Sequence, residues 1–581
     1  MKMSFDGIPI EDIFFSEFAT LAAAPDCVQK LRELILQLAV RGRLVPQDPA
    51  DEPANVLLER IAAEKKRLVK EGKIKKQAPL PRVREDEAPF GVPTGWMWVR
   101  LDTIGQIVGG GTPKTDRSDF FSENGLPWLT PADLNGFKAK YICRGKRDIS
   151  EQGLQKSSAQ LLPAGTVLFS SRAPIGYVAI SANEISTNQG FKSCVPYIPK
   201  MSEYIYYFLK FAGKIIDKNA TGTTFREISG KGMKNVPFPL PPLSEQHRIV
   251  AKVDAIMALC DELEARQVAQ QETHAKIGTA ALAALLEAEN AATFDDAWAR
   301  ICDEFDLIFD TPENVTALRQ AVLQFAVQGK LVEQNPEDEP ASMLLERIAV
   351  EKAQLVKGGK IKKEKPLSPV RGGEVPYVVP EGWVWTKLGS ITSFGPKNGY
   401  SSVAVDSPSN TKCLTLTATT YGSFNPNYYK YIDTDVENDS DLWLEEGDLL
   451  IQRGNSLDYV GISAVYSGPS HEFIYPDLMM KIKFPEDVDV HFASRVINSP
   501  VSRCYFRQKA SGTAGSMPKV NQAIVNNLLF PLPPLAEQHR IVAKVDVLMA
   551  LCDNLEARIR KRQDAQTKLL DSVIAEMTVQ A

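Results

Sequence analysis

The stretch LRELILQLAVRGRLVPQDPADEPANVLLERIAAEKKRLVKEGKIKKQAPL at residues 31–80 returns 287 positions later as LRQAVLQFAVQGKLVEQNPEDEPASMLLERIAVEKAQLVKGGKIKKEKPL at residues 318–367. A second stretch, PLPPLSEQHRIVAKVDAIMALCDELEAR at residues 239–266, returns 292 positions later as PLPPLAEQHRIVAKVDVLMALCDNLEAR at residues 531–558. Self-similarity at a fixed offset is the sequence signature of a repeated architecture. The chain therefore consists of two tandem units, each with a near-copied frame around a middle segment that shares little sequence with its counterpart.

The first part of each frame predicts two short helices. Apolar residues recur at helical spacing, prolines stand where helices begin, and glycines stand where left-handed helix ends are expected. The start signals are Pro53, Pro340, Thr311-Pro312 and its counterpart Pro25, and the end signals are Gly42, Gly72, Gly329 and Gly359. The apolar residues on the second helix of each pair form stripes that we expect to be exposed and to need a partner for solubility: Leu57 and Leu58, and Leu344 and Leu345.

The second part of each frame predicts one long helix. Pro-Pro pairs at 241–242 and 533–534 exclude helix, and a long amphipathic pattern follows each pair. A helix of about 40 residues would be roughly 60 Å long. We expect the two helices to pack on each other, antiparallel, as a rod about a pseudo-twofold axis. The predicted stripes are Ile249, Val253, Ile256, Leu259 and Leu263, and Ile541, Val545, Leu548, Leu551 and Leu555.

The two middle segments, or inserts, predict α/β domains with mainly β cores. They are rich in Gly, Pro, Ser, Thr and aromatic residues, and they contain short β-like runs at 166–169, 177–180, 448–451 and 459–462. GTVLFSSRAPIGYVAIS and GDLLIQRGNSLDYVGIS align strand for strand, which predicts one shared fold. The fold class is therefore α/β multidomain, divided into a helical repeat at 1–89, the first insert at 90–238, a long helix with a second helical repeat at 239–376, the second insert at 377–530, and a long helix at 531–581.

Length and composition agree with this organisation. A chain of 581 residues exceeds the roughly 300 residues that a single core supports, and 44% hydrophobic with 24% charged residues excludes wholesale disorder. No apolar run reaches the about 18 residues of a membrane helix, and the N-terminus has acids where a signal peptide is apolar, so we expect a cytoplasmic protein without a membrane partner. The eight cysteines form no C-x-x-C pair, which favours reduced thiols over disulfides or zinc.

The charge distribution favours a nucleic-acid partner although the net charge is −5. Residues 91–238 carry 18 basic against 11 acidic residues, whereas residues 377–530 carry 12 against 16. Both inserts nevertheless end in a basic tract around a loop of small residues, TGTTFREISGKG at 221–232 and SGTAGSMPK at 511–519, and such loops suit close approach of the backbone to phosphate. A solvated charged face is the alternative. The tracts are Lys210, Lys214, Lys218, Arg226, Lys231 and Lys234, and Arg503, Arg507, Lys509 and Lys519.

Base reading needs forked donors and amides that reach the groove edges. Arg172, Asn188 and Gln189 in the first insert and Arg453 and Asn455 in the second stand at predicted strand ends or loops, where capping a turn is the alternative role. With neighbouring basic, hydroxyl and aromatic residues they form the predicted set of DNA contacts. The set is Lys114, Arg117, Arg172, Asn188, Gln189, Lys192, Thr223, Arg226 and Lys231, and Lys397, Arg453, Asn455, Tyr475, Arg507, Thr513 and Lys519.

The sequence shows no catalytic constellation. Asn425-Pro-Asn-Tyr428 lacks the second proline of an adenine-methyltransferase loop and is interpreted as a turn. The run at 109–113, GGGTP, is not G-x-G-x-x-G, and no G-x-x-x-x-G-K-[ST] occurs. The five histidines show no metal-ligand spacing. We therefore expect no catalytic residue, no metal and no cofactor in this chain.

Taken together, these residues resemble the DNA-specificity (S) subunits of type I restriction-modification systems. The resemblance covers nearly the whole chain and rests on PLPPL-x-EQHRIVAKVD and LLERIA-x-EK in both frames, GW-x-W at the entry of both inserts, and SSRAPIGYVAI, TNQGF and TGTTF in the first insert. The second insert departs from the last two motifs, with IYPDLMMKIKF and SGTAGSMPK instead.

The resemblance implies that the inserts are two target recognition domains, each reading one half of a bipartite double-stranded DNA sequence. The long helices would set the unread spacer and dock two adenine methyltransferase subunits, and restriction subunits would join for host defence. S-adenosylmethionine, ATP and Mg²⁺ would belong to those partner subunits. The alternatives are a self-sufficient DNA enzyme, which the missing cofactor and metal motifs disfavour, and a pure protein-assembly adaptor, which the basic tracts disfavour.

Overall fold

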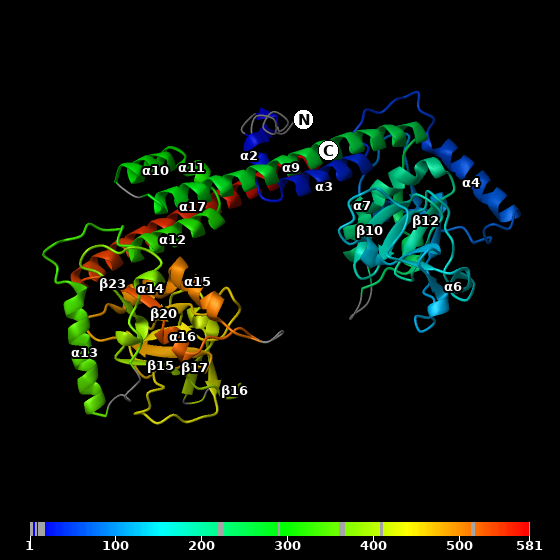
Figure 1. Ribbon diagram of the computed structural model, residues 1–581. Helices are drawn as coiled ribbons and strands as arrows, with labels where there is room; N and C mark the ends of the chain where they lie inside the picture. The colour runs from blue at the N-terminus through cyan, green and yellow to red at the C-terminus, as the bar shows by residue number, and fades with distance from the viewer. Residues whose placement is uncertain are drawn as a thin grey trace. The chain divides into compact units, whose positions relative to one another are not determined.

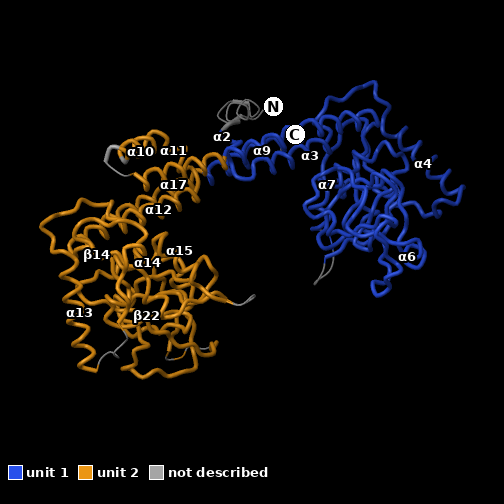
Figure 2. Tube along the Cα trace, viewed as in Figure 1, with its two compact units in different colours: residues 1–270, 563–581 blue, residues 271–562 orange. Residues whose placement is uncertain are grey.

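The computed structural model describes residues 4–5, 8–9, 18–218, 220, 226–288, 291–359, 366–406, 409, 411–512 and 517–579. The chain divides into two compact units, residues 1–270 with 563–581 and residues 271–562, which Figure 2 colours separately. Each unit contains one sheet-rich domain together with helices, as Figure 1 shows. The predicted α/β multidomain class is therefore confirmed.

The domain of unit 1 is built on two sheets. One has the strand order β4-β12-β9-β10-β7 and the other β11-β6-β8-β5, while β13 pairs with β3 and so brings the two ends of the domain together. Helix α7 packs on β9 and β10 (Figure 1). The strands are β3 Met97–Arg100, β4 Gly105–Gly109, β5 Phe121–Ser122, β6 Leu126–Leu129, β7 Tyr141–Ile142, β8 Arg147–Ile149, β9 Val167–Ser171, β10 Ile175–Ser181, β11 Ser186–Thr187, β12 Lys192–Pro196 and β13 Pro237–Leu240. The helices are α5 Leu101–Ile104, α6 Glu151–Gln155, α7 Ser202–Lys218 and α8 Gly230–Lys234.

The domain of unit 2 repeats this arrangement. Its sheets have the orders β15-β22-β19-β20 and β21-β17-β18-β16, and β14 pairs with β23. Strand directions also correspond, since β11 with β6 and β21 with β17 are parallel pairs in otherwise antiparallel sheets. The strands are β14 Val384–Lys387, β15 Phe394–Asn398, β16 Ala404–Val405, β17 Thr411–Leu414, β18 Tyr429–Ile432, β19 Leu449–Gln452, β20 Ser463–Val465, β21 Phe473–Ile474, β22 Met479–Lys483 and β23 Leu529–Leu532. The helices are α14 Val490–Asn498, α15 Pro500–Lys509 and α16 Gln522–Asn526.

The predicted shared fold of the two inserts is thus confirmed, and three of the four β-like runs fall on strands β9, β10 and β19. The run at 459–462 is the exception, because it forms a turn that precedes β20. The amide of Val460 donates to Ser456 O at 2.9 Å, and Gly461 has a φ of 79°. A side chain at Gly461 would also collide with the ring of Phe506, so this stretch turns although its residues are apolar.

The capping signals of the frame are largely confirmed. Pro53 and Pro340 are the N-cap residues of α4 (Ala54–Lys70) and α13 (Ala341–Lys357), and the four glycines at the helix ends have φ of 70° or 71°. Thr311 caps α12 (Pro312–Val327) by accepting a hydrogen bond from Asn314 N at 3.3 Å. The prediction for Pro25 is wrong, since α3 (Cys27–Val40) begins two residues later, after Asp26. The other frame elements are β1 Ser4–Phe5, β2 Ile8–Pro9, α2 Phe18–Ala22, α10 Ala291–Asp303 and α11 Phe305–Ile308.

The two long helices are α9 (Leu243–Leu286) and α17 (Leu535–Val579), with 44 and 45 residues. Their predicted stripes need one correction: Leu259 and Leu551 are 63% and 59% exposed, and the adjacent cysteines are buried instead. Cys260 lies 11 residues after Ile249, which is close to three full turns, whereas Leu259 falls about 80° from that face. The antiparallel packing of the two helices concerns how the units are placed and stays a prediction.

Each frame fastens its domain through a buried tryptophan. In unit 1 Trp96 Nε1 donates to Glu245 Oε2 at 2.8 Å, and Gln47 donates to the other oxygen at 2.7 Å. In unit 2 Trp383 donates to Glu537 at 2.9 Å, and Gln334 donates at 2.7 Å. Burial raises the pKa of both glutamates. We call each set of three residues a tryptophan lock.

The frame helices are themselves part of the core. Leu57 and Leu344 are 1% and 0% exposed, and they pack with residues of the domain and of the long helix. The expectation that these leucines are exposed is therefore wrong for both, while Leu58 and Leu345 are half-buried. All eight cysteines are free thiols, and no helix within the described ranges is long and apolar enough to cross a membrane.

Candidate nucleic-acid interface

In unit 1 three chain segments that are distant in sequence meet where β9 ends. Arg172 directly follows β9 and forms an antiparallel bridge with Glu227. Ser171 N donates to Gly190 O at 2.7 Å, and Ile228 N donates to Ser171 O at 3.1 Å. Segments 188–192 and 227–228 thus flank the end of β9, and the predicted contacts Arg172, Gln189 and Lys192 come together.

These segments place two cations around one carboxylate. Lys192 Nζ lies 3.2 Å from Glu227 Oε1, and Arg172 Nη1 lies 3.7 Å from Glu227 Oε2. The side chains of Arg172 and Glu227 are 35% and 38% exposed, so both remain accessible to a ligand. We call Arg172, Lys192 and Glu227 the Glu227 cluster. It offers donors suited to phosphate or guanine, and an acceptor suited to an amino group.

The neighbouring turn positions this cluster. Lys192 Nζ donates to Gln189 O at 3.3 Å, and the exposed side chain of Gln189 accepts a hydrogen bond from Thr112. Asn188 Oδ1 accepts from Gly190 N at 2.9 Å, so Asn188 has the turn-capping role that was the alternative for it. Gly110 lies so close that a side chain there would collide with the backbone of Asn188. Gly110 and Gly111 of the GGGTP run are therefore explained by close packing of backbones.

The remaining predicted contacts of unit 1 lie outside the cluster. Lys114 and Lys231 are exposed, and Arg117 is exposed while it pairs with Asp119 at 2.7 Å. Arg226 is also exposed, and its guanidinium lies 3.6 Å from Asp217. Thr223 lies outside the described residues. These cations remain available to phosphate, but the structure does not gather them with Arg172.

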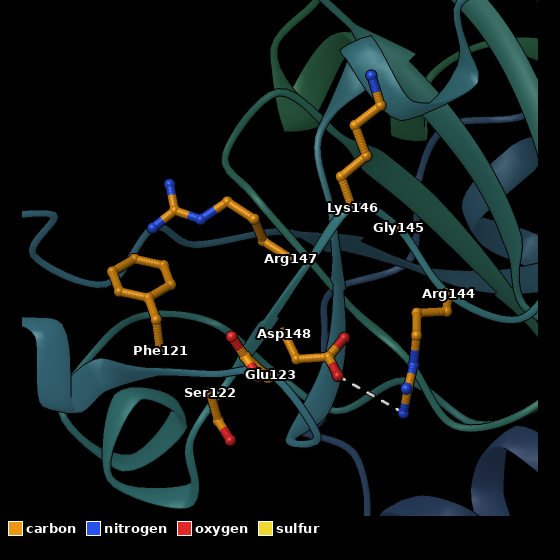
Figure 3. A pocket seen from close by; sticks show the side chains of 8 residues that line it. All are labelled: Phe121, Ser122, Glu123, Arg144, Gly145, Lys146, Arg147 and Asp148. Carbon is orange, nitrogen blue, oxygen red and sulfur yellow. Dashed lines mark ion pairs between the residues drawn. The ribbon is translucent and has the colours of Figure 1, made fainter.

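A second basic group, which the sequence interpretation missed, lines a surface cavity of about 360 Å³ at the edge formed by β5 and β8. Figure 3 shows Arg147 lying over the ring of Phe121, at 4.1 Å from its centroid, and Arg144 directed toward Asp148 at 3.5 Å. Lys146 points away from both of these arginines in the same view. The run RGKR at 144–147 was a visible signal for this group.

In unit 2 the corresponding segments meet where β19 ends. Gly454 forms an antiparallel bridge with Lys519, and Val520 N donates to Arg453 O at 2.8 Å. Asn455 N donates to Pro518 O at 3.3 Å, and the Asn455 side chain donates to Gln452 Oε1 at 2.6 Å. The structure therefore brings the predicted contacts Arg453, Asn455 and Lys519 together, with the Asn455 amide used internally.

The structure does not bring the other predicted contacts of unit 2 together with Arg453, Asn455 and Lys519. Lys397 is exposed and pairs with Asp441, and Arg507 is exposed with Nη2 at 3.9 Å from Asp458. Tyr475 is 0% exposed, so its prediction as a DNA contact is corrected: the ring packs in the core. Arg503 of the basic tract is buried and donates to Val460 O at 2.6 Å, and burial lowers its pKa to about 10. Thr513 lies outside the described residues.

The described residues contain no group of three His, Cys, Asp or Glu side chains that could hold a metal ion. Asn425 and Asn427 form a turn, in which Asn427 N donates to Asn425 Oδ1 at 3.0 Å. This agrees with the interpretation of 425–428 as a turn. The arrangement is thus one of exposed charges around strand ends, which can bind and discriminate a charged polymer.

Comparisons with known proteins identify the kind of polymer. A family model described as type I restriction modification DNA specificity domain matches residues 93–272 and again residues 380–562. The chain is 36% identical to the Escherichia coli type I restriction enzyme EcoAI specificity subunit, over 94% of this chain and 93% of that one. It is 33% identical to the EcoEI specificity subunit of the same organism, over the same shares.

Solved structures give a looser likeness. An S subunit crystal structure from Thermoanaerobacter tengcongensis is 16% identical, with a TM-score of 0.36 and coverage of 84% of this chain and 98% of that one. A chain from a study of complex assembly and conformational transition of the type I R-M system is also 16% identical, with a TM-score of 0.49 and coverage of 84% and 99%.

Proposed function

The chain belongs to the family of type I restriction-modification DNA specificity subunits, and on this premise we propose that it reads a bipartite sequence in double-stranded DNA, one half with each domain. One observation carries the proposal: two domains whose strand orders correspond, apart from the additional edge strand β7 in unit 1, present different side chains at the same surface position, within near-identical frames. Such a chain is suited to two different ligands of one class.

Phosphate contacts would position each domain, and residues at the strand ends would read base edges. Exposed Lys114, Arg117, Arg226 and Lys231 in unit 1 and Arg507 and Lys519 in unit 2 are suited to phosphate. Each phosphate neutralised by such a cation releases counterions, so affinity would fall steeply as salt is raised. A pure protein-assembly adaptor would show little dependence on salt.

The copied frames would dock two adenine methyltransferase subunits, one on each copy, and restriction subunits would complete the complex. The exposed leucines of the long helices support this, because Leu259 and Leu551 occupy equivalent positions and are exposed to a similar degree, 63% and 59%. A leucine that is exposed at the same position of both frames is available for contact with a partner subunit. S-adenosylmethionine, ATP and Mg²⁺ would be supplied at the partner subunits, and this chain would carry no catalytic residue.

The proposal is tested by mapping methylated bases in genomic DNA from cells that contain the methyltransferase subunit, with and without this chain. We expect a split adenine-methylated motif that is present only with the chain. The purified chain alone should transfer no methyl group from S-adenosylmethionine to DNA. An active methyltransferase whose methylation pattern is unchanged by the chain would contradict the proposal, and so would methyl transfer by the chain alone.

The proposed docking role predicts that replacing the exposed leucines weakens binding of the methyltransferase subunit. The double variant Leu259→Asp and Leu551→Asp is expected to fold normally, because both side chains are exposed, and to bind the methyltransferase subunit at least about tenfold more weakly. Co-purification and titration of the two proteins measure this effect. Val268→Asp, at another half-exposed position of α9, is the matched control. Unchanged affinity of the double variant would remove these leucines from the interface.

A further inference from the structure

The residue two positions before the N-cap of α8 in unit 1 is structurally equivalent to the residue two positions before the N-cap of α16 in unit 2. In unit 1 this residue is Glu227, which bridges to Arg172, and the N-cap residue is Ser229. In unit 2 it is Lys519, which bridges to Gly454, and the N-cap residue is Asn521.

Hydrogen bonds fix the register of this equivalence. Ile228 N donates to Ser171 O, and Val520 N donates to Arg453 O, in each case from the residue that follows the bridge. The aligned sequences of β9 and β19 independently match Arg172 with Gly454. Two domains with corresponding strand orders therefore carry opposite charges at one surface position.

The neighbour across the bridge changes together with this charge. Arg172 lies beside Glu227, whereas Gly454 lies beside Lys519, and the Lys519 side chain extends over Gly454, whose Cβ would lie 3.2 Å from Lys519 Cγ. An arginine in place of Gly454 would put two like charges in contact. No ion pair to Lys519 occurs among the residues that the structure describes, so its ammonium is free for a ligand.

The fold does not require either charge, because it accommodates both. Glu227 is 38% exposed and Lys519 is exposed, and both stand where three segments of their domain converge. Each Glu227 oxygen faces one cation, and a carboxylate has about four acceptor positions, so capacity remains for a donor from a ligand.

Given the proposed reading of DNA, on which this step rests, we infer that positions 227 and 519 are the equivalent base-reading positions of the two domains. Glu227 accepts a hydrogen bond from the exocyclic amino group of cytosine or adenine, and Lys519 donates to O6 and N7 of guanine. Arg172 and Lys192 hold the carboxylate in place and offset its repulsion from the phosphates. The two half-sites therefore differ in the base edge presented at this position.

The test replaces Arg172 and Glu227 of the first domain with the residues that the second domain has at the equivalent positions, glycine and lysine. The variant Arg172→Gly with Glu227→Lys is produced with the methyltransferase subunit, and the methylated motif is mapped as for the unchanged chain. At one position of the half-site read by the first domain, the preference for the original base over guanine is expected to fall by at least about tenfold. The other half-site is expected to stay the same. Glu184→Gln, a substitution at an exposed position that changes the charge by the same +1 as the double variant, is the control that should leave both half-sites unchanged.

A motif that keeps its base preference in the double variant, or that loses methylation equally for all bases, would overturn the inference. If the double variant does not accumulate, Lys519→Glu decides by the same criterion on the second half-site, since Lys519 has no ion pair to lose within the described part of the chain. Absence of any split motif with the unchanged chain would instead remove the proposed function. The two failures are therefore distinguishable.

Discussion

Replacing Trp96 by alanine is expected to destabilise unit 1 by about 3–5 kcal/mol, the range for a buried tryptophan. Trp96 is 6% exposed, and its ring fills the space against Gly42 and against the edge of Tyr204, at 6.4 Å between ring centroids. The change also removes the hydrogen bond to Glu245, which is 1% exposed and would be left with Gln47 as its side-chain donor. A buried carboxylate that loses a partner adds to the free-energy loss.

The tryptophan lock offers its own controls. Trp383→Ala should have the same effect in unit 2, because Trp383 makes the same contact with Glu537. Trp96→Phe keeps most of the apolar packing and should cost about 1–3 kcal/mol, which isolates the hydrogen bond. Trp298→Ala removes a tryptophan that is 46% exposed and should change stability by less than about 0.5 kcal/mol. Hydrogen exchange of β3 and β13 in urea measures the effect locally, and unchanged protection in Trp96→Ala would refute it.

The frames could be predicted from the sequence because two copies of each signal were present. Proline at the helix starts and glycine at the helix ends act through local backbone geometry, so they transfer directly to structure, as the φ of Gly42 and Gly329 shows. The prediction that Leu259 lies on the buried face of its helix was wrong. Leucine is the more apolar of two adjacent residues, but the angular position on a helix decides burial, and this position favours Cys260.

The candidate site was only partly predictable. The predicted contacts were cations and amides, because these groups suit DNA, and Arg172 and Lys192 were found in this way. Glu227 was not predicted, since in the sequence alone an acidic residue counts against DNA binding. Only the bridge between Arg172 and Glu227 reveals that this carboxylate stands at the centre. Tyr475 was misplaced because buried residues follow one another at 473–475, so strand alternation does not show which face its ring takes.

Asp448→Asn is expected to destabilise unit 2 by about 3–5 kcal/mol, because it leaves the Lys481 ammonium buried without its charge partner. The two side chains are each 2% exposed and lie 3.4 Å apart, and Lys481 Nζ also donates to Trp443 O at 2.8 Å. Burial lowers the pKa of Lys481. A lysine with a lowered pKa opposes folding while it is charged in both states and ceases to do so above its unfolded value, so the loss of stability should shrink as the pH rises toward about 10, the ordinary pKa of lysine.

Unit 1 has uncharged residues at the two positions that are equivalent to this ion pair. The register of β9 with β12 and of β19 with β22 matches Asp448 with Thr166 and Lys481 with Ser193, both 0% exposed. The same fold thus exists without a buried ion pair at these positions. The double variant Asp448→Thr with Lys481→Ser should therefore retain more stability than Asp448→Asn alone, although it removes more atoms. Chemical unfolding of the three proteins checks the order, and a double variant less stable than the single one would show that the ion pair itself, rather than the relief of an unpaired charge, stabilises this domain.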